Sequence, residues 1–590
     1  MKDQTTRYYE FGPFRLDAAE RQLSRGGARL PLTPKAFELL LALLENGGRV
    51  VSKDALLRKV WPDRCVEEAN ITQVVFVLRK LLGTDDGGRQ YIETVPTRGY
   101  RFASRVTEVA DASGNASEAG GRPGAAVGDG RHVTSIAVLP LANEGGEADL
   151  EYLCDGITET LINALSRLPH LKVMARSTVF RHRGTGADVR QIGRALDVQA
   201  VLIGRVLRSG GRLVISAEMV DAGDGSHVWG GRFVHPRADV LALVEEVAGE
   251  IVAGLRPKLT RGERMTLARR YTEDVEAYHL FMKGRYLWNK RSTKDILQAV
   301  EYFEQAARLD PNYAPAYVGL ADSYSLLRTR AGLAPLAASP RIKLLLQKAL
   351  ELDETLAEAH ASMGYFMTSF EWDWRGAEGE FRRAIELNPN CVTAHHWYSL
   401  YLRALGRSDE ALAEIQSAQR LDPLSPIISG GVGMAYYFAR QYERALAALR
   451  AALELDPNFP GLLGNLGQVY LQMGLHAEAL TEHLRLTSVY DDHEAWTLLG
   501  FSYASTGQKG KATKILERLL AASRRGYIPP FYLALLYIGL GETDAAFYWL
   551  DRAYQSRDGD LTTIKVDPRM DGLMPDPRFT RLLRKLGLDA

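Results

Sequence analysis

The chain has 590 residues, of which 46% are hydrophobic and 25% charged, and its formal net charge is +1. This length exceeds what one hydrophobic core supports, so several domains are expected. No apolar run approaches the roughly 18 residues that span a bilayer, and the N-terminus lacks the apolar stretch of a signal peptide. Cys65, Cys154 and Cys391 lie far apart, which argues against a disulfide framework or a zinc knuckle. We therefore expect a soluble, cytoplasmic, multidomain protein.

The first 106 residues carry more Lys and Arg than Asp and Glu, whereas the remainder is slightly acidic. Four short strand-like segments come first, followed by a helix that Thr33 caps and that has Pro34 at its first position. A second helix begins after Ser52, and a third is expected over residues 67–82. A β-hairpin follows over residues 91–103. Three helices and a hairpin are the layout of an α+β winged helix-turn-helix, which we assign to residues 7–106.

Four segments cover nearly all of this region: FGPFRLD (11–17), LTPKAFELLLALLENGGRVVSKDALLRKVW (32–61), NITQVVFVLRKLLG (70–83) and YIETVPTRGYRF (91–102). They resemble the OmpR/PhoB-type output domain, including its ToxR- and CadC-like branch. The resemblance implies a transcriptional regulator whose third helix enters the major groove of DNA. It also implies that the hairpin, or wing, touches the minor groove or phosphates, and that the loop 62–66 is a candidate contact for RNA polymerase.

The faces of the third helix can be assigned from its apolar spacing. Ile71, Val75, Leu78 and Leu82 fall on one stripe, which predicts the face that packs into the core. The residues on the other faces of the helix, together with the hairpin, are therefore the candidate contacts with double-stranded DNA. They are Ala69, Asn70, Thr72, Gln73, Val74, Phe76, Val77, Arg79 and Lys80 on the helix, and Thr97, Arg98, Tyr100 and Arg101 on the hairpin.

The chemistry of these side chains suggests a division of roles. Gln73 is suited to pair with an adenine edge, while Ala69 or Val77 meets a thymine methyl group. The resembled family usually has arginines at some outward positions where this chain has Phe76 and Val77. The alternative is therefore that these two side chains pack on the wing or on a second copy of the domain. The cations expected to hold phosphates are Lys80, Arg79, Arg98 and Arg101.

Residues 107–133 are rich in Ala, Gly, Ser, Asp and Glu and predict a flexible linker. Residues 134–260 then alternate strand and helix patterns and predict a mixed α/β domain. The segments IAVLPL (136–141), EYLCDGITETLINALSRL (151–168) and VLIGRVLRSGGRLVISAEMVDAGDGSHVWGGRF (201–233) resemble the N-terminal domain of TolB. Three roles stay open for it: a small-ligand sensor, an assembly surface, or a passive spacer.

Helical patterns fill residues 270–590, with Pro389, Pro423 and Pro457 spaced 34 residues apart. Small residues, large apolar residues and the helix-ending proline recur at matching positions and resemble the tetratricopeptide repeat. About eight units fit between Ala277 and Tyr554, and 567–588 resembles a capping segment. An all-α solenoid of this kind is expected to bind a protein partner.

Other candidate motifs favour structural roles over chemistry. His395, His396 and Trp397 suit packing, HEAW (493–496) lacks the second histidine of a zinc motif, and RGTGAD (183–188) lacks the lysine of a phosphate-binding loop. We therefore predict no enzymatic activity, no metal and no cofactor. The expected partners are double-stranded DNA, RNA polymerase, an unidentified protein on the repeats and a second copy of the chain on DNA, with no membrane. The rival hypotheses are a repeat scaffold whose winged helix contacts protein, and an enzyme hidden in the middle domain.

Overall fold

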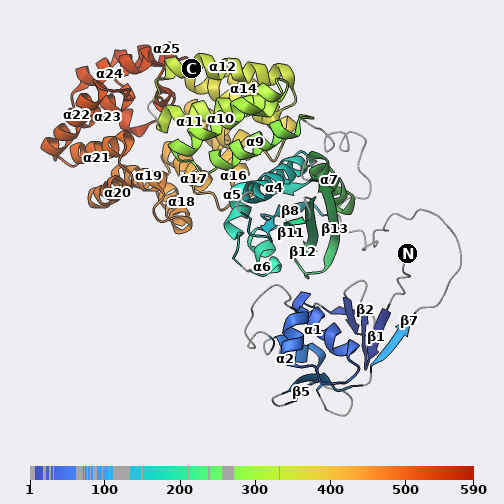
Figure 1. The fold of residues 1–590 in the computed structure, drawn as a ribbon. Helices are drawn as coiled ribbons and strands as arrows, with labels where there is room; N and C mark the ends of the chain where they lie inside the picture. The colour runs from blue at the N-terminus through green and yellow to red at the C-terminus, as the bar shows by residue number, and fades with distance from the viewer. Residues whose placement is uncertain are drawn as a thin grey trace. The chain divides into compact units, whose positions relative to one another are not determined.

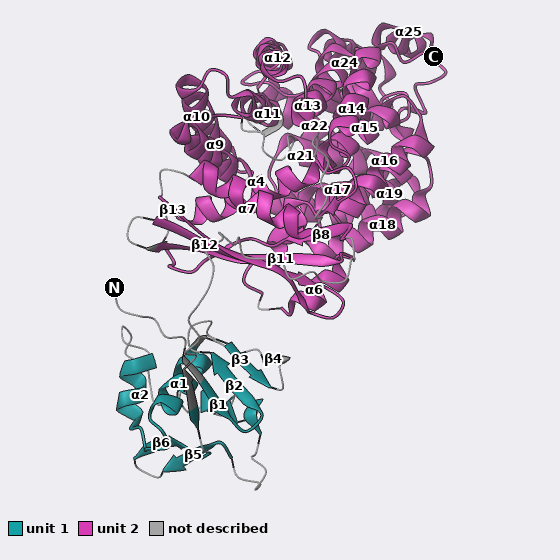
Figure 2. Ribbon diagram, turned by 90° about the vertical axis from the view of Figure 1, so that its right-hand side faces the viewer, with its two compact units in different colours: residues 1–124 teal, residues 125–590 magenta. Residues whose placement is uncertain are grey.

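The chain is described here from a computed structural model, in which it separates into two compact units, residues 1–124 and 125–590 (Figure 2). Within the part of the chain that the structure describes, no helix is both long and apolar enough to cross a bilayer. The described residues are 7–17, 22–25, 28–30, 32, 34–60, 71, 74–75, 78–79, 81–83, 90–95, 98–104, 106–110, 133–147, 150–185, 187–209, 212–236, 240–255, 271–330 and 333–589.

The first unit begins with an antiparallel five-stranded sheet in the order β4-β3-β2-β1-β7. The last of these strands differs from the expectation of a linker that starts at residue 107. Thr107–Ala110 pairs along β1, because the outer edge of that strand offers unpaired N–H and C=O groups to an extended segment. The strands are β1 (Arg7–Phe11), β2 (Phe14–Asp17), β3 (Gln22–Arg25), β4 (Ala28–Leu30) and β7 (Thr107–Ala110).

The predicted helices follow the first four strands. α1 (Pro34–Glu45) packs the fully buried Leu39, Leu40 and Leu43 into the core. α2 (Lys53–Val60) begins where Ser52 Oγ accepts a hydrogen bond from the Ala55 amide at 3.2 Å, as expected of an N-cap. The third helix is helical at each of its described positions between residues 71 and 82.

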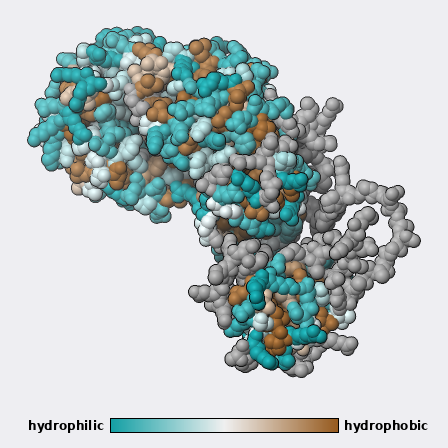
Figure 3. All heavy atoms as spheres, viewed as in Figure 1, coloured by the Kyte–Doolittle hydropathy of each residue, from teal (hydrophilic) through white to brown (hydrophobic). Residues whose placement is uncertain are grey.

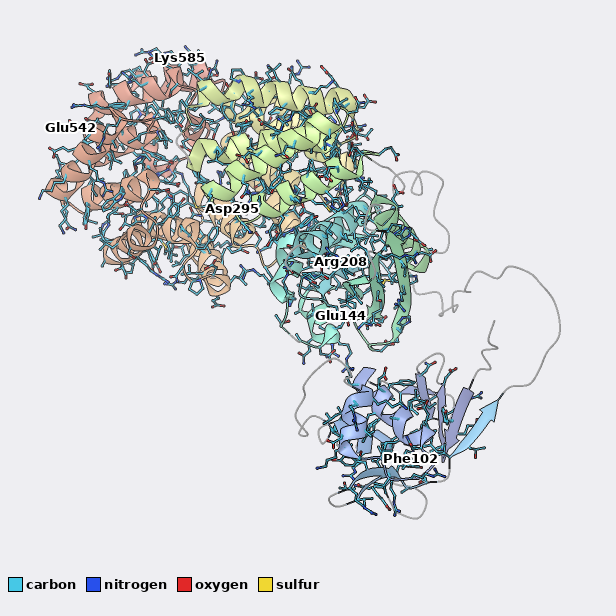
Figure 4. All side chains as sticks on the ribbon, in the orientation of Figure 1. Phe102, Glu144, Arg208, Asp295, Glu542 and Lys585 are labelled. Carbon is cyan, nitrogen blue, oxygen red and sulfur yellow. The ribbon has the colours of Figure 1, made fainter. Side chains whose placement is uncertain are left out.

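The predicted hairpin consists of β5 (Ile92–Val95) and β6 (Gly99–Phe102), paired antiparallel. Phe102, labelled in Figure 4, is buried against Phe11 of β1 with ring centroids 4.9 Å apart. The edge-to-face arrangement of these rings joins the hairpin to the N-terminal sheet.

The second unit opens with an α/β region whose sheet has the order β10-β8-β11-β12-β13, with β9 beside β11. β8 runs parallel to β10 and β11, whereas β11, β12 and β13 form an antiparallel meander. This is the mixed architecture that the sequence predicts. The strands are β8 (Ser135–Val138), β9 (Ala142–Asn143), β10 (Lys172–Val173), β11 (Ala200–Ser209), β12 (Arg212–Asp221) and β13 (His227–Pro236).

Helices pack on this sheet and supply its core. The leucine and isoleucine stripe of α4 is fully buried, as predicted from its four-residue spacing. Two ion pairs attach the loop that follows β9 to strand β11. Glu144 Oε2 lies 3.3 Å from Arg205 Nε, and Glu147 Oε2 lies 2.9 Å from Arg208 Nη1 (Glu144 and Arg208 are labelled in Figure 4). The helices are α4 (Glu151–Ser166), α5 (Arg176–Val179), α6 (Val189–Ala195) and α7 (Val240–Leu255).

Eight antiparallel helix pairs follow in the described part of the chain, and they wind into a curved solenoid (Figure 1). We number them as repeats 1–8 and name the helices of each pair A and B. The pairs are α9 (Val275–Trp288) with α10 (Thr293–Leu309), α11 (Ala314–Arg330) with α12 (Pro335–Leu352), α13 (Ala357–Phe366) with α14 (Trp374–Leu387), α15 (Val392–Ala404) with α16 (Ser408–Leu421), α17 (Pro426–Phe438) with α18 (Tyr442–Leu455), α19 (Pro460–Gln472) with α20 (His476–Val489), α21 (His493–Ser505) with α22 (Lys509–Ser523), and α23 (Pro530–Leu540) with α24 (Thr543–Gln555).

Residues 556–589, the C-terminal segment, do more than cover the last repeat. The segment contains η5 (Gly559–Thr563), η6 (Pro568–Met570) and α25 (Pro577–Leu586), and it returns to repeat 3. The indole Nε1 of Trp374 donates to the carbonyl of Leu586 at 2.6 Å. The solenoid therefore closes on itself, and its end contacts its middle.

Candidate nucleic-acid interface

The third helix of the first unit is held by the stripe that the sequence predicts. Ile71, Val75, Leu78 and Leu82 are all buried, each at most 3% exposed. The prediction that this stripe faces the core is confirmed. Since these positions recur every three or four residues, they fix the rotation of the helix about its axis.

Val74 and Arg79 are the two predicted contact residues of this helix that the structure describes. Val74 is half-buried and packs against the core. Arg79 reaches the hairpin: its Nε donates to the Ile92 carbonyl at 2.9 Å and its Nη2 to Thr94 Oγ1 at 2.8 Å. The guanidinium thus bonds the third helix to β5, a role that sequence analysis missed because the partners lie 13 and 15 residues away and one is a backbone carbonyl.

The hairpin presents two of its predicted basic residues at the surface. Arg101 is exposed and pairs across the strands with Glu93, with Nη2 and Oε2 2.7 Å apart. Arg98 is exposed at the turn, where its backbone amide donates to the Val95 carbonyl at 3.1 Å. Both cations therefore lie on the wing, and that of Arg101 is partly neutralised by a neighbouring carboxylate.

Tyr100 differs from its predicted role as a DNA contact. Its side chain is 4% exposed and belongs to the core of the unit. Its backbone forms an isolated β-bridge with Val51: the Val51 amide donates to the Tyr100 carbonyl at 2.8 Å, and the Tyr100 amide donates to the Val51 carbonyl at 3.0 Å. Because β6 alternates its side chains between two faces, Tyr100 faces the core while Arg101 faces solvent.

Most of the other predicted contact residues, and the candidate polymerase-contacting loop 62–66, lie outside the described residues. These contact residues are Ala69, Asn70, Thr72, Gln73, Phe76, Val77, Lys80 and Thr97.

The motifs set aside as structural have structural partners. His395 Nδ1 lies 2.6 Å from Glu414 Oε2, between two helices of repeat 4, and Trp496 Nε1 donates to Asp491 Oδ1 at 2.5 Å. Asp188, the last residue of the run 183–188, is the N-cap of α6 and accepts a hydrogen bond from the Arg190 amide at 3.0 Å. No group of three His, Cys, Asp or Glu side chains suited to a metal occurs among the residues that the structure describes.

Comparison with known families finds matches in the first unit, in the α/β region and in parts of the repeats. Residues 27–102 match the model described as "Transcriptional regulatory protein, C terminal". The chain carries an OmpR/PhoB-type transcriptional regulatory domain. Residues 132–247 match the model of the second domain of HilA/YgeH-like transcriptional regulators. Tetratricopeptide-repeat models match residues 281–313, 373–426 and 439–500.

Three curated relatives extend the comparison. The transcriptional regulator HilA of Salmonella typhi is 23% identical over 407 residues, which are 68% of this chain and 68% of that protein. The transcriptional activator CadC of Escherichia coli is 39% identical over 82 residues, which are 14% of this chain and 16% of CadC. Putative adenylate cyclase 3 of Rhizobium meliloti is 32% identical over 286 residues, 47% of this chain but only 41% of that relative.

Proposed function

We propose that the protein is a transcriptional regulator that binds double-stranded DNA in a sequence-specific manner through residues 7–106. In this proposal the helix over residues 67–82 enters the major groove and the wing over residues 91–103 lies on the backbone or in the minor groove. The observation that carries the proposal is the pair of hydrogen bonds from Arg79 to β5. They hold a helix and a basic hairpin at a fixed mutual angle, as reading two neighbouring grooves requires.

The proposed contacts divide into base readout and backbone positioning. Gln73 reads an adenine edge, and Lys80, Arg98 and Arg101 neutralise phosphates. Arg79 acts mainly as a positioning residue, since two of its guanidinium nitrogens already donate to the hairpin. Tyr100 is left out of the proposed contact surface, because its side chain is buried.

Selection of bound sequences from random duplexes, with the purified full chain, tests this proposal. We expect one enriched motif containing adenine·thymine pairs, and binding that weakens steeply with added salt. The control is a Gln73→Ala variant, which should retain affinity for the backbone but lose preference at one base pair. Equal affinity for all duplexes would contradict sequence-specific readout, and absence of binding at low salt would contradict the DNA-binding role itself.

The remaining partners complete the proposed mechanism. The repeats engage a protein partner, the loop 62–66 faces RNA polymerase, and two copies bind together on DNA, all in the cytoplasm and without a catalytic step. The visible surface of the repeats is mostly hydrophilic, with scattered apolar side chains (Figure 3). Such a surface favours reversible contacts over a permanent apolar interface.

A further inference from the structure

The turns that follow the B helices of repeats 3, 4 and 5 share one sequence pattern. Each is Leu, then Asn or Asp, then Pro, at 387–389, 421–423 and 455–457. Because the repeats stack in register, turns of this kind line one edge of the solenoid. The α/β region lies against this edge (Figure 1), so the polar residue of each turn is a candidate contact with it.

The turn after repeat 4 contacts α5 most extensively. The carboxylate of Asp422 accepts hydrogen bonds from both Ser177 Oγ and Thr178 Oγ1, the latter at 2.7 Å. Two backbone amides add to this contact. The amide of Leu424 in the turn donates to Thr178 Oγ1 at 3.0 Å, and the amide of Ala175, just before α5, donates to the Leu421 carbonyl at 2.9 Å. Asp422 is 3% exposed, so this carboxylate depends on these donors in place of water.

The turn after repeat 3 supports the preceding part of the α/β region. Asn390 Nδ2 donates to the carbonyls of Ser166 and Leu171 at 2.8 and 2.9 Å, while its Oδ1 accepts the Val173 amide at 3.3 Å. Asn388 Nδ2 adds a bond to Ser166 Oγ at 3.0 Å. One asparagine thus satisfies backbone groups at the end of α4 and at the start of β10.

A separate contact joins the same region to repeat 1. Glu159 of α4, 8% exposed, accepts from Arg285 of α9 at 2.6 Å, and Thr160 Oγ1 lies 2.7 Å from the Tyr278 hydroxyl. A Cβ on Gly156 would lie 2.4 Å from the sulfur of Met282, so the two helices approach as closely as glycine allows. The α/β region therefore contacts repeat 1 with one face and the turns after repeats 3 and 4 with another.

We propose that the Leu-(Asn/Asp)-Pro turns of repeats 3 and 4 form a docking ledge whose partner is the α4–β10–α5 segment of the same chain. The ledge recognises a short helix that carries two consecutive hydroxyl side chains, Ser177 and Thr178, and a strand end that offers unpaired backbone groups. Docking there, together with the contact at repeat 1, fixes the spacing between repeat 1 and repeats 3 and 4. The sequence left three roles open for the α/β region: ligand sensor, assembly surface or passive spacer. Docking on the ledge favours the role of an assembly surface. This inference does not depend on whether the protein binds DNA.

Amide hydrogen exchange of the full chain tests the ledge, because the amides of Ala175 and Leu424 donate across the joint in opposite directions. In Asp422→Ala we expect both amides to exchange roughly tenfold faster or more, since two hydrogen bonds to a buried carboxylate are lost. The matched control is Asp456→Ala, which removes the same position one repeat later. Asp456 accepts the Asn458 amide of its own turn, and this change should leave both reporter amides as in the wild type.

Three outcomes would overturn the proposal. The first is unchanged exchange at both reporters in Asp422→Ala, and the second is equal acceleration in Asp456→Ala, which would indicate general loosening of the solenoid. If Asp422→Ala does not fold, Asp422→Asn retains one acceptor oxygen and should accelerate exchange at both reporters by a smaller factor. Wild-type exchange in that variant is the third contradicting result.

Discussion

Substitution of Gly99 by alanine tests how the wing is attached to the rest of its unit. Gly99 has φ +142°, and a Cβ there would lie 2.0 Å from the Val51 carbonyl oxygen and 2.9 Å from Ser52 Cα. The methyl group must break the Val51–Tyr100 bridge, whose two hydrogen bonds contribute about 0.5–1.5 kcal/mol each. Forcing alanine into this backbone region costs about 1–3 kcal/mol more. We expect a total loss of about 2–6 kcal/mol, a large fraction of the stability of a small domain.

Urea unfolding of residues 1–124, which form a compact unit with a core of its own, measures this loss. Gly47→Ala is the matched control, since Gly47 also has a positive φ of +54° but a Cβ there meets nothing within 4 Å. The control should cost only the backbone term of about 1–2 kcal/mol. Equal shifts of the unfolding midpoint in the two variants would refute the steric argument, because only Gly99→Ala places a Cβ against Val51 and Ser52.

Four further predictions concern the DNA contacts and the repeats. Arg98→Ala should reduce the slope of log affinity against log salt by about 0.9, as loss of one phosphate contact does; an unchanged slope would remove Arg98 from the interface. Arg79→Ala should change that slope less than Arg98→Ala does, but should lower the stability of the first unit by about 1–3 kcal/mol in urea unfolding, because it loses two hydrogen bonds to the hairpin. Burial lowers the pKa of His483 to about 4, below its unfolded value of about 6.5, so the unfolded chain binds the extra proton between these pH values. The free energy of unfolding should therefore fall by about 3 kcal/mol from this group as pH drops from 7 to 4, and His483→Asn should lack that part of the pH dependence when unfolding is followed by circular dichroism. Asp571→Ala removes an exposed pair with Arg440 (Nη2–Oδ1 2.6 Å) and should cost less than about 1 kcal/mol in thermal unfolding; a larger loss would mean that this pair holds the C-terminal segment in place.

Local signals predicted much of the fold. Thr33-Pro34 and Ser52 indicated where two helices begin, and the stripe from Ile71 to Leu82 indicated which face of the third helix is buried. The 34-residue spacing of prolines indicated the repeats. The caps and the stripe depend on residues within a few helical turns of each other, and the repeats on a period that recurs along the chain, so the sequence pattern contains this information.

Contacts between distant segments could not be read in the same way. Arg79 resembles any surface arginine in the sequence, and its bond to the Ile92 carbonyl depends on where the hairpin lies. Asp422 reads as an ordinary helix-ending residue, yet its partners Ser177 and Thr178 lie more than 240 residues earlier. The strand Thr107–Ala110 has a linker-like composition, and only the free edge of β1 gives it a partner.

Closure of the solenoid has a consequence for how the protein acquires its structure. Trp374 and Leu586 are 212 residues apart, so their contact is among the most non-local in the chain. Bringing ends that far apart together costs about 5 kcal/mol in chain entropy, and such contacts form late in folding. During synthesis, repeat 3 is made long before α24 and α25 leave the ribosome. For that interval Trp372 lacks its stacking partner Tyr554, and Trp374 lacks the Leu586 carbonyl. The nascent chain therefore exposes part of an aromatic surface until both α24 and α25 have been made.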